Sequence, residues 1–491
     1  MALLAGSAIL TASAADSFIA DGLSFTTTSD STVMVSYDKT YDEMTSVTVP
    51  ASVTNERKTY TVTGVSQGCF QRCEKITAIT LPSTITEVAK SSFSGCYALE
   101  SINLGDTKVT SIPTSCFSAC RKLKTITVPA TVKTIAKNPF VQNLALKSIN
   151  VAEGNPAYKS IDGVLFTISG KTLQAYPCGK TTEYTVPEGT DSIGSEAFNT
   201  NQVIVSVALA KSVKFIGMSA FLYCDKMTTL TIPEGSQLTK IMGSAFSSCK
   251  ILTGHLNLPE GFSSLSSNAF NNTSLTEVTI PSTLTDIGNT AFSYCASLTK
   301  VNIIGEGLTN IGNSAFASTG LTEFVIPNSV TKLGMTVFDG CKKLQRLTIG
   351  SGISNIQIRT FSSCSALKEV TCLNPEPPTC SVSDTYPLFP ATVFSSAVLK
   401  VPAGSVEAYK AADNWKNFQK VETDNVGIEA VSSYEGDIRT AEGGIMTEGA
   451  SVEIYTISGQ RIYKGNGGYV SLPAKGIYLV RIDGRTHKIV F

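Results

Sequence analysis

A single phenylalanine column most constrains the fold of this chain, because phenylalanine recurs at steps of 22 to 25 residues along most of its length. The column has two runs, which are Phe70, Phe93, Phe117 and Phe140, and then Phe198, Phe221, Phe246, Phe270, Phe292, Phe316, Phe338 and Phe361. A fixed period of this size is typical of a protein built from stacked structural repeats. We therefore expect each period to form one coil.

Residues 273–295, TSLTEVTIPSTLTDIGNTAFSYC, show the repeating unit. It reads Leu-x-x-Val-x-Ile-Pro, five variable residues, and Ile-Gly-x-x-Ala-Phe-x-x-Cys. Apolar residues alternate with polar ones in the first half, which predicts a short strand with one buried face, closed by the proline. The glycine then turns the chain back. Because one coil cannot bury its apolar side alone, stacked coils should form a β-rich solenoid with a parallel sheet on one face.

The composition of the chain excludes several classes of function. The 39 basic residues balance 39 acidic ones, so the chain lacks the positive field that attracts nucleic acid or anionic lipid. Only 16% of the residues are charged and there are two histidines, so the usual catalytic and metal-binding groups are scarce. We expect no enzyme activity, no cofactor and no metal.

Cysteine follows the phenylalanine by three residues in eight coils and is replaced there by Asn or Thr in the others. These small side chains are expected to hydrogen-bond the backbone of neighbouring coils as buried, free thiols. Cys372 and Cys380 lie outside this column and form the one pair for which a disulfide stays open. The predicted structural ladder comprises Phe93, Phe117, Phe221, Phe246, Phe292, Phe338, Cys96, Cys120, Cys224, Cys249, Cys295 and Cys341.

The residues on either side of the central Ile of each strand should point outward and form the exposed sheet face. The candidate binding residues on this face are Thr229, His255, Asn257, Glu277, Lys300, Glu323, Arg346 and Glu369. The last five are 23 residues apart with alternating charge, which predicts a structural ladder of cross-strand ion pairs.

Glycoside hydrolysis and glycan binding are the alternative functions of this face. Cationic neighbours lower the pKa of a carboxylate, which disfavours a glycosidase acid. Neither outward row carries an aromatic ring for stacking on sugars, so protein recognition is favoured and glycan binding is the alternative.

The repeat is interrupted near residues 151–184. Asp162-Gly163 and Ser169-Gly170 are turn pairs beside apolar runs, so residues 155–180 are expected to form an extra hairpin or irregular coil. This insert is a second candidate for partner binding.

The first residues, ALLAGSAILT after Met1, are apolar and lead to Ala12-Ser13-Ala14, which fits a signal-peptidase site. The usual basic start is missing, so the true start is expected upstream of Met1; a buried helix is the alternative. No later run reaches the roughly 18 apolar residues of a membrane helix.

The repeated pattern resembles the BspA-like leucine-rich-repeat surface proteins over residues 60–420. The resemblance implies an α/β horseshoe-like, β-rich solenoid, and a non-catalytic role in adhesion or in binding a protein of a host or neighbouring cell. The segment 399–418 resembles the family's closing cap, with Trp415 and Phe418 plugging the core. Secretion or display on the outer cell surface is implied, with the periplasm as the alternative.

The C-terminal residues are similar to the sorting domain of the type IX secretion system. The matching positions are Gly476, Ile477, Tyr478 and the terminal Lys488 to Val490, and an accessory β-sandwich without that role is the alternative. The expected organisation is a signal peptide (1–14), an N-terminal β cap (15–66), repeats (67–395), a C-terminal cap (396–421), a linker with first strands (422–450) and a small β-sandwich (451–491).

Overall fold

The computed structural model describes residues 16–381, 387–423, 438–441, 444–447, 451–456, 461–472, 477–482 and 485–490. The expected signal peptide (1–14) and most of the expected linker lie outside the described residues. The chain divides into two compact units, residues 1–184 with 189–205, and residues 185–188 with 206–491. We describe each by itself.

An antiparallel sheet opens the first unit, with strand order β1-β2-β3-β6-β5. The β3–β6 pair is parallel, and so is the pairing of β6 with β8 (Glu87–Val88) at the side of this order. Tyr41, from the 3-10 helix η1 (Lys39–Glu43), stacks on Phe70 at 5.3 Å between ring centroids. The sheet therefore closes the end of the phenylalanine column. Its strands are β1 (Ser17–Ala20), β2 (Leu23–Thr27), β3 (Thr32–Ser36), β5 (Ser52–Asn55) and β6 (Lys58–Val65).

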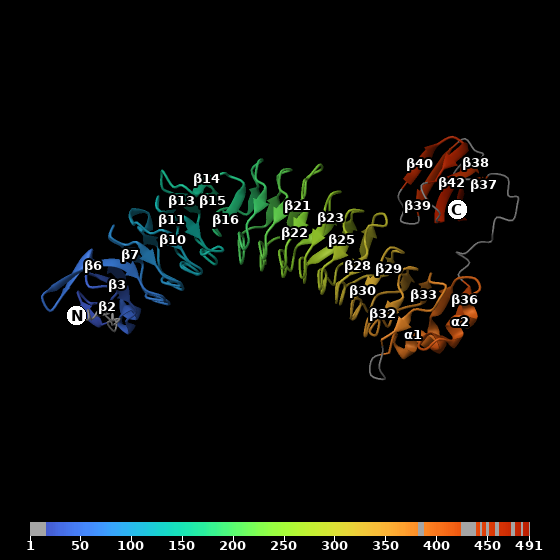
Figure 1. Ribbon diagram of the computed structural model, residues 1–491, viewed down its shortest axis with the longest axis horizontal. Helices are drawn as coiled ribbons and strands as arrows, with labels where there is room; N and C mark the ends of the chain where they lie inside the picture. Colours follow the sequence, from blue (N-terminus) through green and yellow to red (C-terminus); the bar gives the residue numbers. More distant parts are fainter. Residues whose placement is uncertain are drawn as a thin grey trace, which may run out of the picture. The chain divides into compact units, whose positions relative to one another are not determined.

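Each coil contributes one longer strand to a first parallel column, here named the strand face (Figure 1). In the first unit this column contains β4 (Ser46–Thr48), β7 (Ala78–Thr80), β9 (Ser101–Ile102), β11 (Thr125–Val128) and β13 (Ser148–Val151). In the second unit it contains β19 (Ser206–Ala208), β21 (Thr229–Thr231), β23 (Thr253–Asn257), β25 (Ser274–Ile280), β27 (Lys300–Ile303), β29 (Glu323–Ile326), β31 (Arg346–Ile349), β33 (Glu369–Cys372), β35 (Val398–Val401) and β36 (Lys420–Thr423). The strand β17 (Glu183–Thr185) lies at the boundary between the units.

The return half of each coil carries a second strand of two residues, which forms a second parallel column, the return face. In the first unit these strands are β8 (Glu87–Val88), β10 (Ser111–Ile112), β12 (Thr134–Ile135) and β18 (Ser192–Ile193), with the 3-10 helix η2 (Leu104–Asp106). In the second unit they are β20 (Phe215–Ile216), β22 (Lys240–Ile241), β24 (Ser264–Leu265), β26 (Asp286–Ile287), β28 (Asn310–Ile311), β30 (Lys332–Leu333), β32 (Asn355–Ile356) and β34 (Thr379–Cys380). The predicted solenoid is confirmed, and in the described residues 67–381 strands take the place that helices occupy in a horseshoe.

The core is the phenylalanine column. In the second unit neighbouring rings from Phe221 to Phe361 are stacked, with centroids 4.8 to 5.8 Å apart. In the first unit Phe70, Phe93, Phe117 and Phe140 stack in the same way, 5.0 to 6.0 Å apart. All of these rings are buried, so each coil covers the apolar side of the next.

The expectation that the glycine of the Ile-Gly pair turns the chain is wrong, because Gly288 does not have a left-handed backbone conformation. Left-handed residues follow it instead, such as Thr290 (φ 54°) and Tyr294 (φ 61°). A Cβ at Gly288 would lie 2.5 Å from the backbone carbon of Ser266 in the preceding coil. Glycine is therefore required because two backbones approach closely.

The interruption of the repeat forms three antiparallel strands. They are β14 (Tyr158–Ile161), β15 (Val164–Thr167) and β16 (Thr172–Ala175), joined by turns at Asp162-Gly163 and Ser169-Gly170. The strand β16 then pairs in parallel with β18, so the insert rejoins the return face of the first unit.

Two short helices close the solenoid of the second unit, α1 (Ala391–Ser396) and α2 (Val406–Ala411), with the 3-10 helix η3 (Trp415–Asn417). Trp415 is fully buried, and its Nε1 donates to the carbonyl of Pro378 at 2.8 Å. Cys372 and Cys380, the pair left open for a disulfide, are both free thiols in the structure.

The described C-terminal strands form two sheets, with orders β37-β38-β41 and β40-β39-β42-β43. Residues from both sheets, including Ile445 and Ile454, share one buried cluster, as in a small sandwich. The strands are β37 (Ile438–Ala441), β38 (Gly444–Thr447), β39 (Val452–Thr456), β40 (Arg461–Gly465), β41 (Gly468–Ser471), β42 (Ile477–Ile482) and β43 (Arg485–Val490). Gly476 and the side chains of Ile477 and residues 488–490, part of the sorting-domain match, lie outside the described residues.

Candidate binding face

The strands β23, β25 and β27 bring the central candidate residues together. Their parallel register places His255 opposite Glu277 and Glu277 opposite Lys300. The next outward row contains Asn257, Thr279 and Asn302 in the same order. Two polar rows therefore run side by side across three neighbouring strands.

Hydrogen bonds fix the side chains of this cluster. The Glu277 carboxylate accepts from Lys300 Nζ at 3.0 Å and from Asn302 Nδ2 at 2.6 Å. These two contacts, Lys300 first, hold the pKa of Glu277 below its usual value. His255 Nε2 lies 2.8 Å from Thr279 Oγ1. Glu277 is thus an ionised acceptor, which suits binding of a cationic group better than proton donation.

The charged column continues on β29, β31 and β33, but it forms separate pairs rather than one continuous ladder. Arg346 Nη2 lies 2.5 Å from Glu323 Oε2, and the register places Arg346 opposite Glu369 as well. Glu369 instead pairs with Lys400 of β35 at 2.7 Å. The sequence analysis missed Lys400, because the 23-residue step ends at Glu369 and β35 belongs to the cap.

The strand face is interrupted twice in the second unit. Its strands group as β19-β21, β23-β25-β27 and β29-β31-β33-β35-β36, so Thr229 on β21 lies in a different sheet from His255. The register between β23 and β25 shifts between Gly254, which has φ 92°, and His255, and this bulge leaves Thr276 of β25 without an opposite residue. A bulge changes the direction of the side chains that follow it, so His255 and Asn257 begin a new block of the face.

A hollow lies beside this bulge, at the ends of β21 and β23. Its volume is about 650 Å³, and its lining includes Glu234, Ser236, Asn257 and Glu260. Glu260 uses its carboxylate to accept from the backbone N–H of Ser282 at 3.3 Å and from its hydroxyl at 3.1 Å. Within the described residues, no group of three His, Cys, Asp or Glu side chains is arranged to hold a metal ion.

Two residues of the row that contains Asn257 and Thr279 depart from a simple exposed, polar face. Thr371 is only 7% exposed and lies opposite Lys400 in the register. Val325, by contrast, is 54% exposed and places an apolar side chain between the charged pairs.

The ladder residues are buried behind this face, where their side chains pack and hydrogen-bond within the core. The Cys249 thiol donates to the Phe221 carbonyl at 3.0 Å, and Cys295 and Cys341 donate to Phe270 and Phe316 at 3.1 Å. In the first unit, Cys96 and Cys120 bond Phe70 and Phe93 at 3.0 and 3.2 Å. Each of these thiols binds the carbonyl of the phenylalanine one coil earlier, and Phe246, Phe292, Phe338 and Cys224 are buried in the same column.

The repeat region was compared with known proteins. The profile of the BspA type leucine-rich repeat region, in six copies, matches residues 40–171, 167–299 and 285–377. This chain belongs to the BspA-type leucine-rich-repeat family. The profile matches more than half of the chain, and the matched residues carry the coil pattern that both units share.

One solved structure shows the same fold, and two others are compared by sequence identity and coverage. A leucine-rich repeat protein from Bacteroides ovatus is 23% identical, with a TM-score of 0.53, and the match covers 83% of this chain and 99% of that one. The pneumococcal vaccine antigen PcpA is 20% identical, with a TM-score of 0.35, covering 84% and 98%. A leucine-rich cell surface protein from Faecalibacterium prausnitzii is 22% identical, with a TM-score of 0.35, covering 60% and 96%.

No curated protein matches the chain. Among the described residues, none of the helices has the length and apolar character needed to cross a membrane.

Proposed function

We propose that this chain is an exported or cell-surface protein that binds a protein partner through the strand face of its second unit, without catalysis. Membership of the BspA-type family supports a protein-binding role. The observation that carries the proposal is the set of fixed, opposite charges on neighbouring strands, Glu277 with Lys300 and Glu323 with Arg346.

The chemistry of this face favours a protein over a glycan. Charges of both signs, held at strand spacing, give electrostatic complementarity to a partner with its own pattern of charges. The exposed Val325 and the Arg346 guanidinium add the apolar and arginine contacts that protein interfaces favour. A neutral glycan would satisfy none of the charges.

Export rests on the two ends of the chain. Residues 1–14 fit a signal peptide, and residues 451–491 resemble a type IX sorting domain, so the outer cell surface or the medium is the proposed destination and the periplasm the alternative. Fractionation of the native host with an antibody tests this. Protein outside the outer membrane with a new N-terminus after Ala14 supports export, whereas cytoplasmic protein that retains Met1 contradicts it.

The binding proposal is tested by a screen of the full chain against two immobilised panels. One contains purified extracellular-matrix and cell-surface proteins, and the other contains polysaccharides. Saturable binding to a protein that excess salt weakens supports the proposal, because exposed charges are screened by salt. Binding to polysaccharides alone, or to neither panel, contradicts it.

A further inference from the structure

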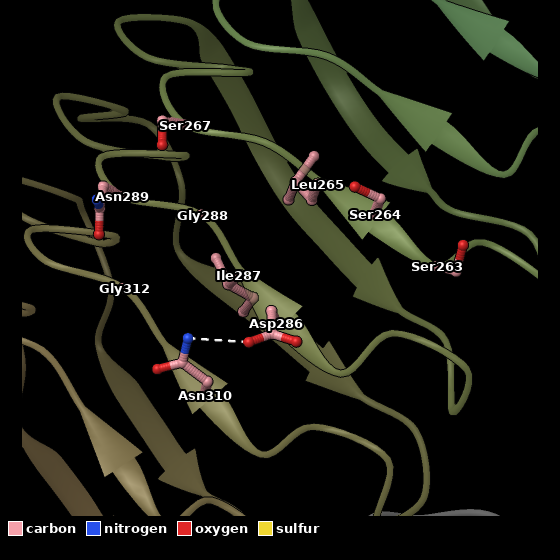
Figure 2. A pocket seen from close by; sticks show the side chains of 10 residues that line it. All are labelled: Ser263, Ser264, Leu265, Ser267, Asp286, Ile287, Gly288, Asn289, Asn310 and Gly312. Carbon is pink, nitrogen blue, oxygen red and sulfur yellow. Dashed lines mark hydrogen bonds between the residues drawn. The ribbon is translucent and has the colours of Figure 1, made fainter.

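The return face of the second unit carries a groove that the strand-face proposal does not use. It lies over β24, β26 and β28 and has a volume of about 300 Å³. Figure 2 shows Asp286 and Asn310 on one side and Ser267 and Asn289 on the other, with Gly288 and Gly312 between them. The groove thus has two polar walls and a floor of bare backbone.

The packing of the coils produces this floor. A Cβ at Gly312 would lie 2.7 Å from the backbone nitrogen of Asn289, and one at Gly288 would meet the backbone of Ser266. Glycine is needed there for close stacking, and the outer surface consequently has no side chains at these positions. The floor continues from one coil to the next because Gly288 and Gly312 follow paired strands, β26 and β28.

The first wall presents hydrogen-bond acceptors. Asn310 Nδ2 donates to Asp286 Oδ1 at 2.9 Å, and Thr285 Oγ1 donates to Asp286 Oδ2 at 2.6 Å. These contacts, Thr285 first, lower the pKa of Asp286, so the carboxylate is ionised at neutral pH. They also fix the Asn310 amide, whose Oδ1 is then available as an acceptor.

The second wall presents donors. Asn289 Oδ1 accepts from the backbone N–H of Asn313 at 2.8 Å, and Asn313 Oδ1 accepts from that of Met335 at 2.8 Å. Because both amide oxygens bind backbone N–H groups, the two Nδ2 groups are the free ends of these side chains. Donors and acceptors therefore face each other across the floor, one set for each coil.

The spacing of the coils determines which kind of linear polymer can make the same contacts on successive coils of the groove. Neighbouring coils are about 4.8 Å apart, whereas an extended peptide repeats its side-chain direction every two residues, or about 6.6 Å. A peptide lying along the stack would lose register after one coil. A pyranose ring in a linear glycan advances by a length close to the coil spacing, and its hydroxyl groups both donate and accept hydrogen bonds. The groove has no aromatic side chain in its lining, so recognition here rests on hydrogen bonds to facing donors and acceptors, which the strand face does not offer in this arrangement.

We propose that the groove over β24, β26 and β28 binds a linear, hydroxyl-rich oligosaccharide that runs along the stack, with one sugar ring on each coil. The site is separate from the strand face, so this chain would recognise a glycan on one side and a protein on the other. Ser264, Asp286 and Asn310 occupy equivalent positions of the three coils and contact successive rings.

The test is calorimetric titration of the full chain with linear di- to hexasaccharides of glucose, xylose, mannose, galactose and galacturonic acid. We expect binding in at least one series, with affinity that rises from the disaccharide to the trisaccharide and is level beyond the tetrasaccharide. Failure of every series to bind at millimolar concentration would overturn the proposal, as would affinity that is independent of chain length.

Two variants locate the site. Asp286→Lys and Ser264→Lys fill the groove with a side chain that the same column already accommodates at Lys240 and Lys332. Each should weaken oligosaccharide binding at least tenfold with an unchanged melting temperature. The control Glu74→Lys makes the same charge change on an exposed residue of the first unit and should have no effect.

Unchanged binding by both groove variants would place the glycan elsewhere and refute the assignment. The outcome is distinguishable from failure of the strand-face proposal, because Asp286→Lys should leave binding of a protein partner unaltered.

Discussion

The Cys249 thiol donates to the carbonyl of Phe221, one coil earlier in the stack, at 3.0 Å. The same carbonyl also accepts from the backbone N–H of Cys224 in its own coil. The thiol hydrogen bond and the stacking of the phenylalanine rings therefore join neighbouring coils wherever both residues recur. Thr273 and Thr319 occupy the cysteine position in other coils and donate to the carbonyl of their own coil's phenylalanine.

This geometry predicts which substitutions the column tolerates. Cys249→Thr keeps a small donor and should change the free energy of unfolding by less than about 1 kcal/mol. Cys249→Leu adds volume to a fully buried site and should cost about 1–3 kcal/mol. Urea unfolding of the two variants checks the difference, and equal effects would contradict a packed hydrogen-bonding role.

Alkaline pH should destabilise the protein through its buried thiols. Burial raises the pKa of Cys120 to about 12 and that of Cys178 to about 11. An unfolded thiol ionises near pH 8.5, so between that pH and the folded pKa the unfolded state binds fewer protons. The contribution of these thiols to the free energy of unfolding should therefore be constant below about pH 8 and fall as the pH rises, by up to about 1.4 kcal/mol per pH unit for each thiol.

Urea titrations between pH 7 and pH 11 under reducing conditions measure this slope. A Cys120→Thr variant supplies the matched control, because it removes one ionisable group and keeps a small hydrogen-bonding side chain. Its slope should be shallower than that of the parent chain, and an identical slope would show that buried thiols do not cause the effect.

Gly288 should be sensitive to size rather than to backbone conformation. Gly288→Ala places a Cβ against the backbone of Ser266 and should cost about 2–3 kcal/mol, as overpacking does. Gly235 provides the comparison, since it has φ 74° and no atom within 4 Å of the added Cβ.

Asparagine separates the two causes, because it tolerates the left-handed conformation. Gly235→Asn should be nearly neutral in thermal unfolding, whereas Gly288→Asn should destabilise at least as much as Gly288→Ala. The reverse order would mean that close coil stacking does not explain the Ile-Gly pattern.

How far the sequence predicts this structure depends on how strongly each element is patterned. The solenoid is predictable because the step between phenylalanines such as Phe270 and Phe292 recurs in every coil of the repeat. The pairing of Glu277 with Lys300 follows from the same step, since equal spacing in a parallel column fixes the register.

The return strands escaped prediction for a physical reason. A strand of two residues, such as Asp286–Ile287, is too short to show an alternation of period two. Thr290 and Tyr294 adopt the left-handed conformation although neither is a glycine, so the sequence does not mark them as turn residues. The groove beside Asp286 depends on both features, so it appears only when the coils are stacked in three dimensions.

The interruptions of the strand face also required the structure. Gly254 lies in a variable stretch, and only the structure shows its φ of 92° and the shift in register that leaves Thr276 without an opposite residue. Lys400 lies in a cap whose spacing differs from the repeat, so its pairing with Glu369 could not be obtained from the 23-residue step.

Charge reversal at one ladder position should have a small, salt-dependent effect on stability. Arg346→Glu removes the ion pair with Glu323 and places three carboxylates on neighbouring strands, so the coil should be destabilised by about 1 kcal/mol and the melting temperature should fall at low salt. High salt should abolish the difference. Lys343→Glu, at an exposed residue of the same coil, is the control, and an equal loss there would show that pairing with Glu323 has no part.

The most direct test of the strand face exchanges its charges without removing its ion pairs. A chain with Glu277→Lys, Lys300→Glu, Glu323→Arg and Arg346→Glu keeps both cross-strand pairs and inverts the pattern that a partner meets. The control exchanges Glu100 and Lys124, which are paired at 3.2 Å in the first unit. Binding to the protein partner found in the screen is measured by surface plasmon resonance, with melting temperatures recorded in parallel. We predict that the fourfold variant loses at least tenfold in affinity at an unchanged melting temperature while the control binds like the parent chain; equal affinity for all three chains would contradict the account.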